Sequence, residues 1–580
     1  MMDYSQALER ASEYLGKREI VEVLSYDKKR KLELPVHLDV WEITTEVINE
    51  QNDLLEISLH LVFLSDYPLS FPKVQLSKED FDKLKYIPHL QVDRIICVFQ
   101  NNSEPLIDAP ELVVDEAINR AKTIIENGLK GINENEYLDE FESYWDAPYS
   151  KKDMVNNSYL LMIEKPIEER FYLISLDKPI SSYNNIIHQN EKNAQHFKSY
   201  LEEKNINFTE TTGLIVPNLD ILLKPPFNFS NKVIFDNIQT SNKDFFRTYI
   251  SKINDKTFPK LFLFPKDINS EIRYFGWEHS LPNLNRKGFR KKSLNNFKVL
   301  STFQSAEKIK RVSPQVYSNQ RMVKRTSGEQ NIKKAQKFVI AGVGSIGSNL
   351  IHFLNSQPNS EFKLIDNDKL KLENIGRHYL GFNHLNSFKT TALKDFLLSN
   401  SPIQKVETKE ESIVHLIKND PAFVNESDYL FVAIGESNIE TWIANAIENK
   451  TITTPTFFIW VEPYLLGGHC IFINPKNNVY QTLFDDKGLF KFNIIKDYSN
   501  ELLTLKEAGC QSNYTPYSSN NIQIYLGALF LEISKVISLN DPNSRSYTWI
   551  GDKGISTDMS IELSDYSSGF DSNTLIENEL

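Results

Sequence analysis

The sequence predicts a multidomain protein in which two regions of mixed α and β structure precede an α/β domain with a parallel sheet. Three observations lead to this fold class. The chain has 580 residues, more than one hydrophobic core holds. Short alternating strands occupy the first part, as in Leu54–Leu64. From Lys337 onward, buried strands and helices alternate, which is typical of parallel sheets covered by helices.

The predicted boundaries divide the chain into residues 1–154, 155–305 and 306–580. In the first region, Asp3–Glu22 and Pro110–Glu126 show the apolar spacing of helices, and Ile57, Leu59 and Leu61 alternate with polar residues as in a strand. This pattern indicates a compact α+β domain. The second region mixes strand runs with helix-like stretches and contains no chemical motif, so we expect an α+β connecting domain of open function.

Composition excludes several classes of protein. The net charge of -12 provides no basic excess to neutralise phosphates, so we expect no nucleic-acid partner. The N-terminus lacks the apolar core of a signal peptide, and no run of about 18 apolar residues indicates a membrane helix. Three cysteines without a CxxC pair form neither a disulfide framework nor a structural zinc site. We therefore expect a cytoplasmic protein in a reducing compartment.

A glycine turn stands between the first strand and the first helix of the last region. Gly342, Gly344 and Gly347 form G-x-G-x-x-G, in which the glycines allow a tight turn and the helix N-terminus favours an anionic phosphate. Asp366 ends the next strand, where a carboxylate can accept hydrogen bonds from ribose hydroxyls. These residues predict a Rossmann-like nucleotide site, and a NAD-dependent dehydrogenase has the same pattern up to this point.

The residues that follow separate these two possibilities. Asp366 and Asp368, then Asn374 and Arg377, form D-x-D-x5-N-x-x-R, and Lys389 follows in SFKTTAL. This pattern resembles the ThiF/MoeB and ubiquitin-activating adenylation family. The resemblance implies that the acid holds the ribose of ATP, and that Asn, Arg and Lys hold the phosphates. A triphosphate needs cations and amide donors, whereas a dinucleotide needs mainly the glycine turn.

One position departs from the family pattern. The family carries an Asp after the fourth strand, where it helps to hold Mg²⁺, but this sequence reads AIGESN, which makes Glu436 the candidate metal ligand. The resemblance also implies a homodimer, in which Arg321 or Arg325 reaches the triphosphate, often across the dimer.

Two of the three cysteines lie in the last region. Cys510 stands in EAGCQSNYTPYSSNN, a polar segment before an apolar helix, and it resembles the catalytic cysteine loop of the same family. Thiolate formation needs solvent or nearby cations, which a polar loop provides. Cys470 alternates within the apolar strand LLGGHCIFINP and is predicted to be a core residue without chemistry, while His469 is a candidate to face the nucleotide side.

Cys97 belongs to the first region, in RIICVFQ. The preceding YPLSFPKVQL resembles the ubiquitin-conjugating pattern Y-P-x-x-P-P-x-V, with Phe71 in place of one proline. That family places an Asn about eight residues before its cysteine, and here His89 occupies this place, as in the prokaryotic conjugating-like domains. The resemblance implies that Cys97 is catalytic and that His89 stabilises an oxyanion through its ring N–H.

The order of domains resembles the bacterial fusion enzymes of anti-phage CBASS operons. It implies that ATP activates the C-terminal carboxylate of a cGAS/DncV-like nucleotidyltransferase, that Cys510 takes the acyl group as a thioester, and that Cys97 passes it to an amine of a target protein. Two alternatives remain open. A sulfur-carrier adenylase for thiamin or molybdopterin synthesis shares the last region, and a nucleotide-regulated scaffold has an inert conjugating-like domain.

Overall fold

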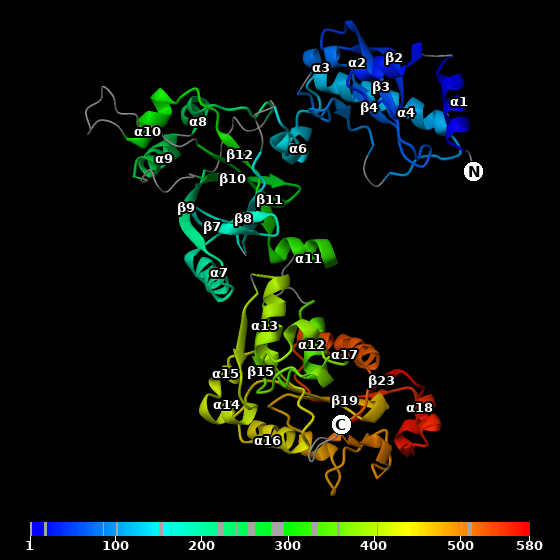
Figure 1. Cartoon of the computed structure of the whole chain (residues 1–580), viewed down its shortest axis with the longest axis vertical. Coiled ribbons are helices and arrows are strands. Elements are labelled where there is room, and N and C mark those ends of the chain that lie inside the picture. The colour runs from blue at the N-terminus through cyan, green and yellow to red at the C-terminus, as the bar shows by residue number, and fades with distance from the viewer. Residues whose placement is uncertain are drawn as a thin grey trace. The chain divides into compact units, whose positions relative to one another are not determined.

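The computed structural model describes residues 3–16, 20–84, 86–99, 103–149, 155–163, 165–216, 224–238, 240–252, 261–279, 295–327, 335–356, 360–402, 404–499, 501–506 and 513–580. The chain forms two compact units, residues 1–318 and 319–580. The first unit contains two sheets and the second contains one large sheet, each with its own helices (Figure 1).

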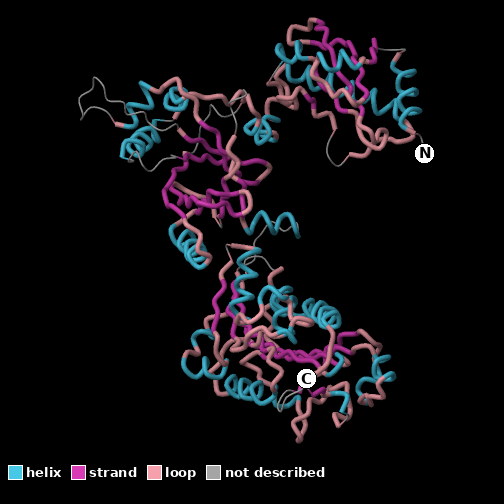
Figure 2. Tube along the Cα trace, in the orientation of Figure 1, coloured by secondary structure: helices cyan, strands magenta, loops and turns pink. Residues whose placement is uncertain are grey.

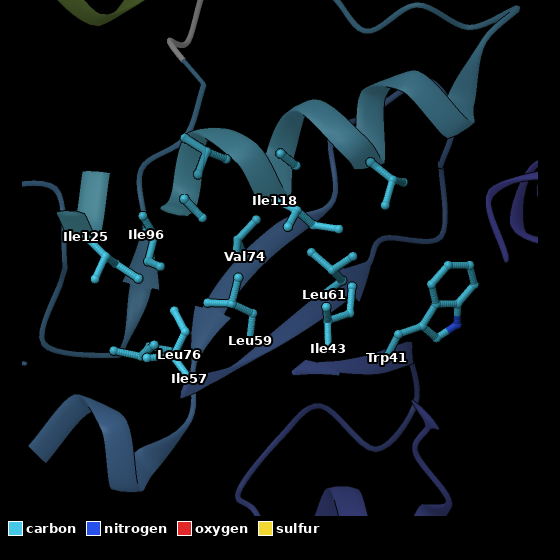
Figure 3. Packing of buried hydrophobic residues seen from close by; sticks show 14 of the residues in the cluster. Trp41, Ile43, Ile57, Leu59, Leu61, Val74, Leu76, Ile96, Ile118 and Ile125 are labelled. Carbon is cyan, nitrogen blue, oxygen red and sulfur yellow. The ribbon is translucent and has the colours of Figure 1, made fainter. Parts of the chain in front are cut away.

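The N-terminal domain is a five-stranded antiparallel sheet in sequence order, with a long helix across one face. Alternate side chains of the strands meet this helix, and Figure 3 shows Ile43, Leu61 and Val74 packed beneath Ile118. The elements are α1 (Tyr4–Leu15), β1 (Ile20–Val23), α2 (Tyr26–Lys31), β2 (Asp39–Ile48), β3 (Leu54–Phe63), β4 (Lys73–Leu76), α3 (Lys78–Leu84), β5 (Ile95–Ile96) and α4 (Pro110–Leu129).

The first helix is shorter than its apolar spacing predicts. It ends at Leu15 instead of Glu22, and Ile20–Val23 forms strand β1 against Trp41–Thr44 of β2. The residues of β1 are mostly β-branched, and such side chains favour a pleated, half-buried surface over a helix. The strand therefore extends the sheet at its edge.

The second sheet of the first unit has eight strands in the order β12-β11-β10-β9-β7-β8-β6-β13. It curls until its ends approach each other, because Asn156, just before β6, bridges Val312 of β12. Apolar side chains from most of these strands share one inner core, and Figure 2 shows the curvature of the strands. The strands are β6 (Tyr159–Met162), β7 (Arg170–Ile180), β8 (Tyr183–His188), β9 (Phe208–Ile215), β10 (Leu261–Ile268), β11 (Glu271–Glu278), β12 (Lys310–Val312) and β13 (Gln315–Tyr317).

Helices cover the outer face of this sheet, and two of them come from the predicted first domain. Phe141 and Trp145 stack on each other and pack against Phe264 and Phe275. The buried Arg311 donates hydrogen bonds to the carbonyl oxygens of Trp145 and Ala147. The helices are α5 (Glu136–Asp139), α6 (Phe141–Asp146), α7 (Glu191–Glu203), α8 (Asn231–Asn237), α9 (Thr240–Lys252), α10 (Asn296–Lys298) and the π-helix η3 (Val299–Phe303).

The boundaries therefore differ from those predicted at residues 154 and 305. Helices α5 and α6 belong to the core of the second sheet, although they precede residue 154. Strands β12 and β13 complete that sheet, although they follow residue 305. Short strands and helices carry too few residues for sequence periodicity to assign them to one of two adjacent cores.

The two sheets of the first unit are joined through α5 and α6. The imidazole of His89 lies between two carboxylates, with Nε2 2.9 Å from Glu136 Oε2 and Nδ1 2.7 Å from Glu140 Oε1. The Tyr144 hydroxyl donates to Glu140 at 2.8 Å, and its oxygen lies 3.3 Å from the carbonyl oxygen of Ile87. The segment before Cys97 is thereby fixed to helices that are buried in the connecting domain.

The C-terminal unit contains an eight-stranded sheet in the order β16-β15-β14-β17-β18-β19-β22-β23. The first five strands are parallel, as predicted, and the last three are antiparallel. The short link between β18 and β19 explains the change, since a parallel crossover needs a dozen or more residues. The strands are β14 (Lys337–Ala341), β15 (Glu361–Ile365), β16 (Val406–Lys409), β17 (Tyr429–Val432), β18 (Thr456–Val461), β19 (Gly467–Ile473), β22 (Arg545–Ile550) and β23 (Thr574–Asn578), beside the small pair β20 (Leu505–Lys506) and β21 (Asn513–Tyr514).

Helices cover both faces of this sheet, with α12 and α17 on one side and α14 and α16 on the other (Figure 1). This arrangement confirms the α/β class predicted from the alternation of strands and helices. The α-helices are α11 (Asn319–Ser327), α12 (Ser345–Leu354), α13 (Lys389–Asn400), α14 (Ile413–Asn419), α15 (Ala422–Asn425), α16 (Ser437–Glu448), α17 (Ser519–Leu539) and α18 (Lys553–Asp558). The 3-10 helices are η4 (Leu372–Asn374), η5 (Phe382–His384), η6 (Pro463–Leu465), η7 (Tyr480–Leu483), η8 (Glu501–Leu503) and η9 (Asp565–Gly569).

Helix α17 is long and apolar enough to cross a membrane by length and composition, and among the described residues it is the one helix that meets this test. Its inner side is packed against the protein. Ile522, Tyr525 and Leu529 are buried, and the Tyr525 hydroxyl donates to the carbonyl of His469 at 2.7 Å. These contacts are those of a core helix.

The His89 cluster predicts a pH-dependent stability of the first unit. Hydrogen bonding to Glu140 raises the pKa of His89 above its usual 6.5. The stability that protonated His89 adds to the fold is therefore complete below this usual pKa and is lost as pH rises through the raised pKa. Burial raises the pKa of Glu140, but the hydrogen bonds from His89 and Tyr144 outweigh burial and lower it from 4.5. The stability that the Glu140 carboxylate adds to the fold is therefore lost only as pH falls through this lowered pKa.

We expect thermal unfolding of the whole chain to show that the stability advantage of wild type over His89→Asn is largest near pH 6 and shrinks toward pH 9. His384→Asn, which changes a histidine of the other unit, serves as the control and should keep the wild-type profile. An advantage that is equal at both pH values would show that the ion pairs contribute nothing.

Candidate functional site

A cavity of about 170 Å³ opens at the carboxyl ends of the parallel strands in the C-terminal unit. This edge of an open α/β sheet is where ligands bind. Six of the predicted site residues line the cavity, and they come from the segments that follow β14, β15 and β17 and from the start of α13. They are Gly342, Gly344, Asp366, Asp368, Lys389 and Glu436.

The glycine turn needs glycine at two positions for steric reasons. Gly342 has φ +83°, and a Cβ there would lie 2.7 Å from the carbonyl oxygen of Ala433. A Cβ at Gly347 would lie 2.0 Å from the carbonyl oxygen of Gly342, so Gly347 allows the helix to approach the turn. Gly344 has no atom within 4 Å of an added Cβ, which leaves the backbone open toward the cavity. This geometry suits a phosphate beside the N-terminus of α12.

Two side chains hold this turn in place. Asp366 Oδ2 accepts the backbone N–H of Val343 at 2.9 Å, and Oδ1 accepts that of Asp368 at 2.8 Å. The buried His378 ring lies 2.9 Å, through Nε2, from the carbonyl oxygen of Val343 and accepts the N–H of Leu380 at 3.0 Å through Nδ1. Burial lowers the pKa of His378 to about 4, so its ring is neutral and Nε2 donates.

Lys389 supplies a positive charge to the cavity. Its Nζ lies 2.9 Å from Asp368 Oδ2, and its side chain is 10% exposed while that of Asp368 is 65% exposed. The ammonium therefore already stands beside the turn, held by a carboxylate that solvent reaches. A phosphate oxygen can replace this partner with little movement of the lysine.

Asn374 and Arg377 lie outside the residues that line this cavity. Asn374 Oδ1 accepts the N–H of Lys371 at 3.0 Å. The Arg377 guanidinium donates to the carbonyl of Thr515 at 3.2 Å and lies 5.2 Å from the ring centre of Tyr517. The structure thus does not bring these two predicted phosphate ligands to the cavity.

Arg377 is nevertheless connected to the glycine turn. The hydroxyl of Tyr517, the aromatic residue against which the guanidinium packs, lies 2.7 Å from Ser345 Oγ at the start of α12. The carbonyl of Arg377 accepts the side-chain amide of Asn349 at 3.1 Å. Arg377 is therefore separated from the first turn of this helix by one side chain.

The fit for Mg²⁺ depends on carboxylates that remain available at the cavity. Glu436 lines the cavity, and its side chain makes no hydrogen bond or ion pair with the described residues. The carboxyl of Glu440, one turn later, is buried, and burial raises its pKa to about 7. Mg²⁺ is bound through one or two carboxylates together with substrate phosphates, so Glu436 fits this role, although no group of three metal-ligating side chains is found among the described residues.

Cys510 lies outside the described residues, between β20 and β21 along the chain. Arg321 and Arg325 are on α11 and do not line the cavity. Cys470 is fully buried, which raises the pKa of its thiol and confirms a core residue. His469 does not face the nucleotide side, because its Nε2 lies 2.6 Å from the buried carboxylate of Glu462.

Cys97 forms a second candidate site in the N-terminal domain. It follows β5, is half-buried, and its backbone N–H donates to the carbonyl of His89 at 2.9 Å. Its Sγ accepts a hydrogen bond from Gln91 Nε2 at 3.1 Å. Burial, with smaller effects of Glu140 and Asp93, raises the pKa of this thiol to about 11.

His89 is not arranged as an oxyanion donor. Both ring nitrogens are bound to the carboxylates of Glu136 and Glu140, so no ring N–H is left for an acyl group on Cys97. These two carboxylates lie 47 and 51 residues later in the chain, so the spacing of a short motif could not reveal them. The donor at the sulfur is instead Gln91, which the sequence analysis missed.

Two family models match separate parts of the chain. Prokaryotic E2 family B matches residues 42–155, which cover β3, β4, β5 and Cys97. The ThiF family matches residues 317–525, which cover the glycine turn, the cavity and Cys510.

The ATP-dependent ubiquitin transferase-like protein Cap2 of Pseudomonas aeruginosa is 24% identical over 204 residues, which are 34% of this chain and 35% of that protein. The chain thus matches about a third of the length of this curated relative. Among solved structures, selenomethionine PaaA is 18% identical over 42% of this chain and 64% of that chain, with a TM-score of 0.28. E. coli MccB with AMPCPP and MccA is 17% identical over 40% and 63%, with a TM-score of 0.28.

The assignment rests on the two family models and on the topology of the sheets that they cover. The antiparallel sheet with Cys97 lies in the first match, and the mixed sheet with the glycine turn lies in the second. The chain is a fusion of a prokaryotic E2 family B domain with a ThiF family domain.

Proposed function

We propose that this chain adenylates the C-terminal carboxylate of a partner protein with ATP and conjugates that protein to an amine through two cysteines. The observation that supports this most is the occurrence on one chain of an ATP-type cavity, with Lys389 and Asp366 beside a glycine turn, and a separate cysteine site in an E2 family domain. An adenylase alone does not need the second site.

The first step is chemical activation of a carboxylate, which is a poor electrophile. The carboxylate oxygen attacks the α-phosphorus of ATP and pyrophosphate leaves, which gives an acyl-adenylate. The turn at Gly344 presents backbone N–H groups to the phosphates, and Lys389 offsets their charge. Mg²⁺ held at Glu436 supplies further charge neutralisation when it is bound.

The second step is thioester relay. The Cys510 thiolate attacks the acyl-adenylate and AMP leaves, and the Cys97 thiolate then attacks the resulting thioester and releases Cys510. An amine of the target finally attacks the Cys97 thioester to form an amide. The sequence of acyl transfers replaces one difficult condensation by easier steps, which is covalent catalysis. Both cysteines on one chain raise the concentration of each for the other.

The partner is proposed to be a cGAS/DncV-like nucleotidyltransferase of a CBASS anti-phage operon, acting in the cytoplasm. The support is the order of the domains and the similarity to a protein named Cap2. A sulfur-carrier adenylase is the second candidate, since it shares the ThiF domain. The Cys97 site with its hydrogen-bonded Gln91 favours conjugation. An inert scaffold is the third candidate, and an unreactive Cys97 would favour it.

We expect the nucleotide site to prefer ATP to NAD. Calorimetry of the whole chain should detect binding of Mg²⁺-ATP and no binding of NAD(H), because the positive charge of Lys389 suits a triphosphate. Lys389→Ala should reduce partner-dependent ATP–pyrophosphate exchange by about 100-fold. Arg377→Ala should reduce it as well, since Arg377 lies one side chain from the start of α12.

Lys394→Ala is the matched control, because this lysine is on the same helix and does not line the cavity. Its exchange rate should equal that of wild type. Binding of NAD(H) without ATP would contradict the proposal.

The relay predicts an order for the two cysteines. Cys510→Ala should abolish both thioesters and leave adenylate formation intact, since of the two relay cysteines only Cys510 belongs to the ThiF domain. Cys97→Ala should leave a reductant-sensitive adduct on Cys510 and stop amide formation. Reducing and non-reducing gels with ATP and the partner measure both outcomes.

Cys470→Ala is the control for cysteine loss, because this residue is fully buried in β19. It should conjugate normally. If Cys510→Ala still charges Cys97 at the wild-type rate, Cys97 attacks the adenylate directly and the relay is wrong.

We further expect a homodimer formed through the ThiF domain. Sedimentation of the whole chain at several concentrations should give the mass of two copies. A monomer at every concentration would exclude this assembly and any role of Arg321 or Arg325 across it.

A further inference from the structure

We propose that Gln91 is a catalytic residue of the Cys97 site, whose side-chain amide stabilises the Cys97 thiolate whenever a thioester at this sulfur is made or broken. The catalytic part of this inference rests on the proposed function. The hydrogen bond itself is a property of the thiol and can be tested without any conjugation.

The geometry places a donor directly at the reacting atom. Gln91 Nε2 lies 3.1 Å from Cys97 Sγ, within the range for a hydrogen bond to sulfur. An amide has two N–H groups and a thiolate is an acceptor, so the charged form of the sulfur gains more from this contact than the neutral thiol. The contact therefore favours the reactive form.

The backbone holds both residues in place. The N–H of Gln91 donates to the carbonyl of Ile95 at 2.9 Å, and the N–H of Arg94 donates to the carbonyl of Gln91 at 2.9 Å. Leu90 and Ile96 form an antiparallel bridge. Gln91 and Cys97 thus lie on opposite sides of one narrow hairpin, and the backbone positions their side chains for contact in advance.

The surroundings make such a donor necessary. Burial disfavours a negative charge on the Cys97 sulfur most strongly, and the nearby carboxylates of Glu140 and Asp93 disfavour it further. Among the residues that the structure describes, the contact that acts in the opposite direction is the hydrogen bond from Gln91. His89 cannot provide it, because both of its ring nitrogens are bound by Glu136 and Glu140.

The same contact serves both directions of acyl transfer. In charging, the Cys97 thiol loses its proton to solvent, the thiolate forms the new C–S bond, and the donor cysteine leaves as a thiolate. In discharge, the amine forms the C–N bond, the C–S bond breaks, and Cys97 leaves as a thiolate while the nitrogen loses its proton. Charge develops on Sγ in each case, 3.1 Å from the amide nitrogen of Gln91.

The first test measures the reactivity of the thiol. In the whole chain carrying Cys470→Ala and Cys510→Ala, the rate of Cys97 alkylation by iodoacetamide reports the thiolate fraction at each pH. Gln91→Leu, which keeps the size and removes the donor, should slow alkylation at pH 8 by about tenfold. Gln91→Glu should slow it further, since it adds a negative charge.

Gln75→Leu is the matched control. Gln75 is on the neighbouring strand β4 and donates to the carbonyl of Asp93 at 2.7 Å, so it contacts the same hairpin without reaching the sulfur. Its alkylation rate should equal that of the parent. Gln91→Asn, whose shorter arm withdraws the amide, should behave like Gln91→Leu and tests the same contact if the leucine variant fails to fold.

The second test measures catalysis. In chains that retain Cys510, discharge of the Cys97 thioester to free lysine should slow by the same factor in Gln91→Leu. Alkylation at the parent rate in Gln91→Leu, or equal slowing in Gln75→Leu, would overturn the hydrogen bond. Slowed alkylation with unchanged discharge would overturn the catalytic role, whereas absence of any Cys97 thioester in wild type would overturn the proposed function instead.

Discussion

The position of the Cys97 site depends on one imidazole held between two carboxylates. Glu136 and Glu140 bind both nitrogens of His89, and the backbone carbonyl of His89 in turn accepts the N–H of Cys97. Glu136 begins α5 and Glu140 directly precedes α6. Helix α6 carries Phe141 and Trp145, which are buried in the connecting domain. The loop before the cysteine also contains residues with positive φ, His89 and Arg94, a conformation that persists only when its surroundings enforce it. The connecting domain therefore helps to shape the site of its neighbour, which gives the middle region a structural role.

The nucleotide site follows a similar logic with different groups. The carboxylate of Asp366 accepts two backbone N–H groups and fixes the glycine turn. The neutral ring of His378 donates to the carbonyl of Val343 in the same turn. Lys389 supplies a positive charge to the cavity beside this turn. The segment after the Cys510 region reaches the same turn, because Tyr517 contacts both Ser345 and Arg377. The glycine turn and the segment that follows Cys510 along the chain are thus in direct contact within one domain.

Much of the fold could be predicted, because long elements carry strong periodic signals. The helix from Pro110 and the strand from Leu54 begin where the pattern places them, and the alternation after Lys337 indicated the parallel half of the large sheet. Short elements were missed. Strand β1 follows directly on a helix-like pattern, and α5 and α6 pack on a sheet whose strands come later in the chain. Periodicity reports which side of an element is apolar and not which core receives that side.

The sequence by itself determined which reactive and binding groups are present: a glycine turn followed by an acid and a lysine, and a cysteine in a conjugating-type segment. Each of these motifs is recognisable because its residues lie within a few dozen positions of one another. Only the tertiary structure decided which groups act together. It gave His89 to Glu136 and Glu140, placed Gln91 at the Cys97 sulfur, and packed Arg377 against Tyr517. The physical reason is that hydrogen bonds and ion pairs act over about 3 Å, whereas their partners can be separated by any length of chain.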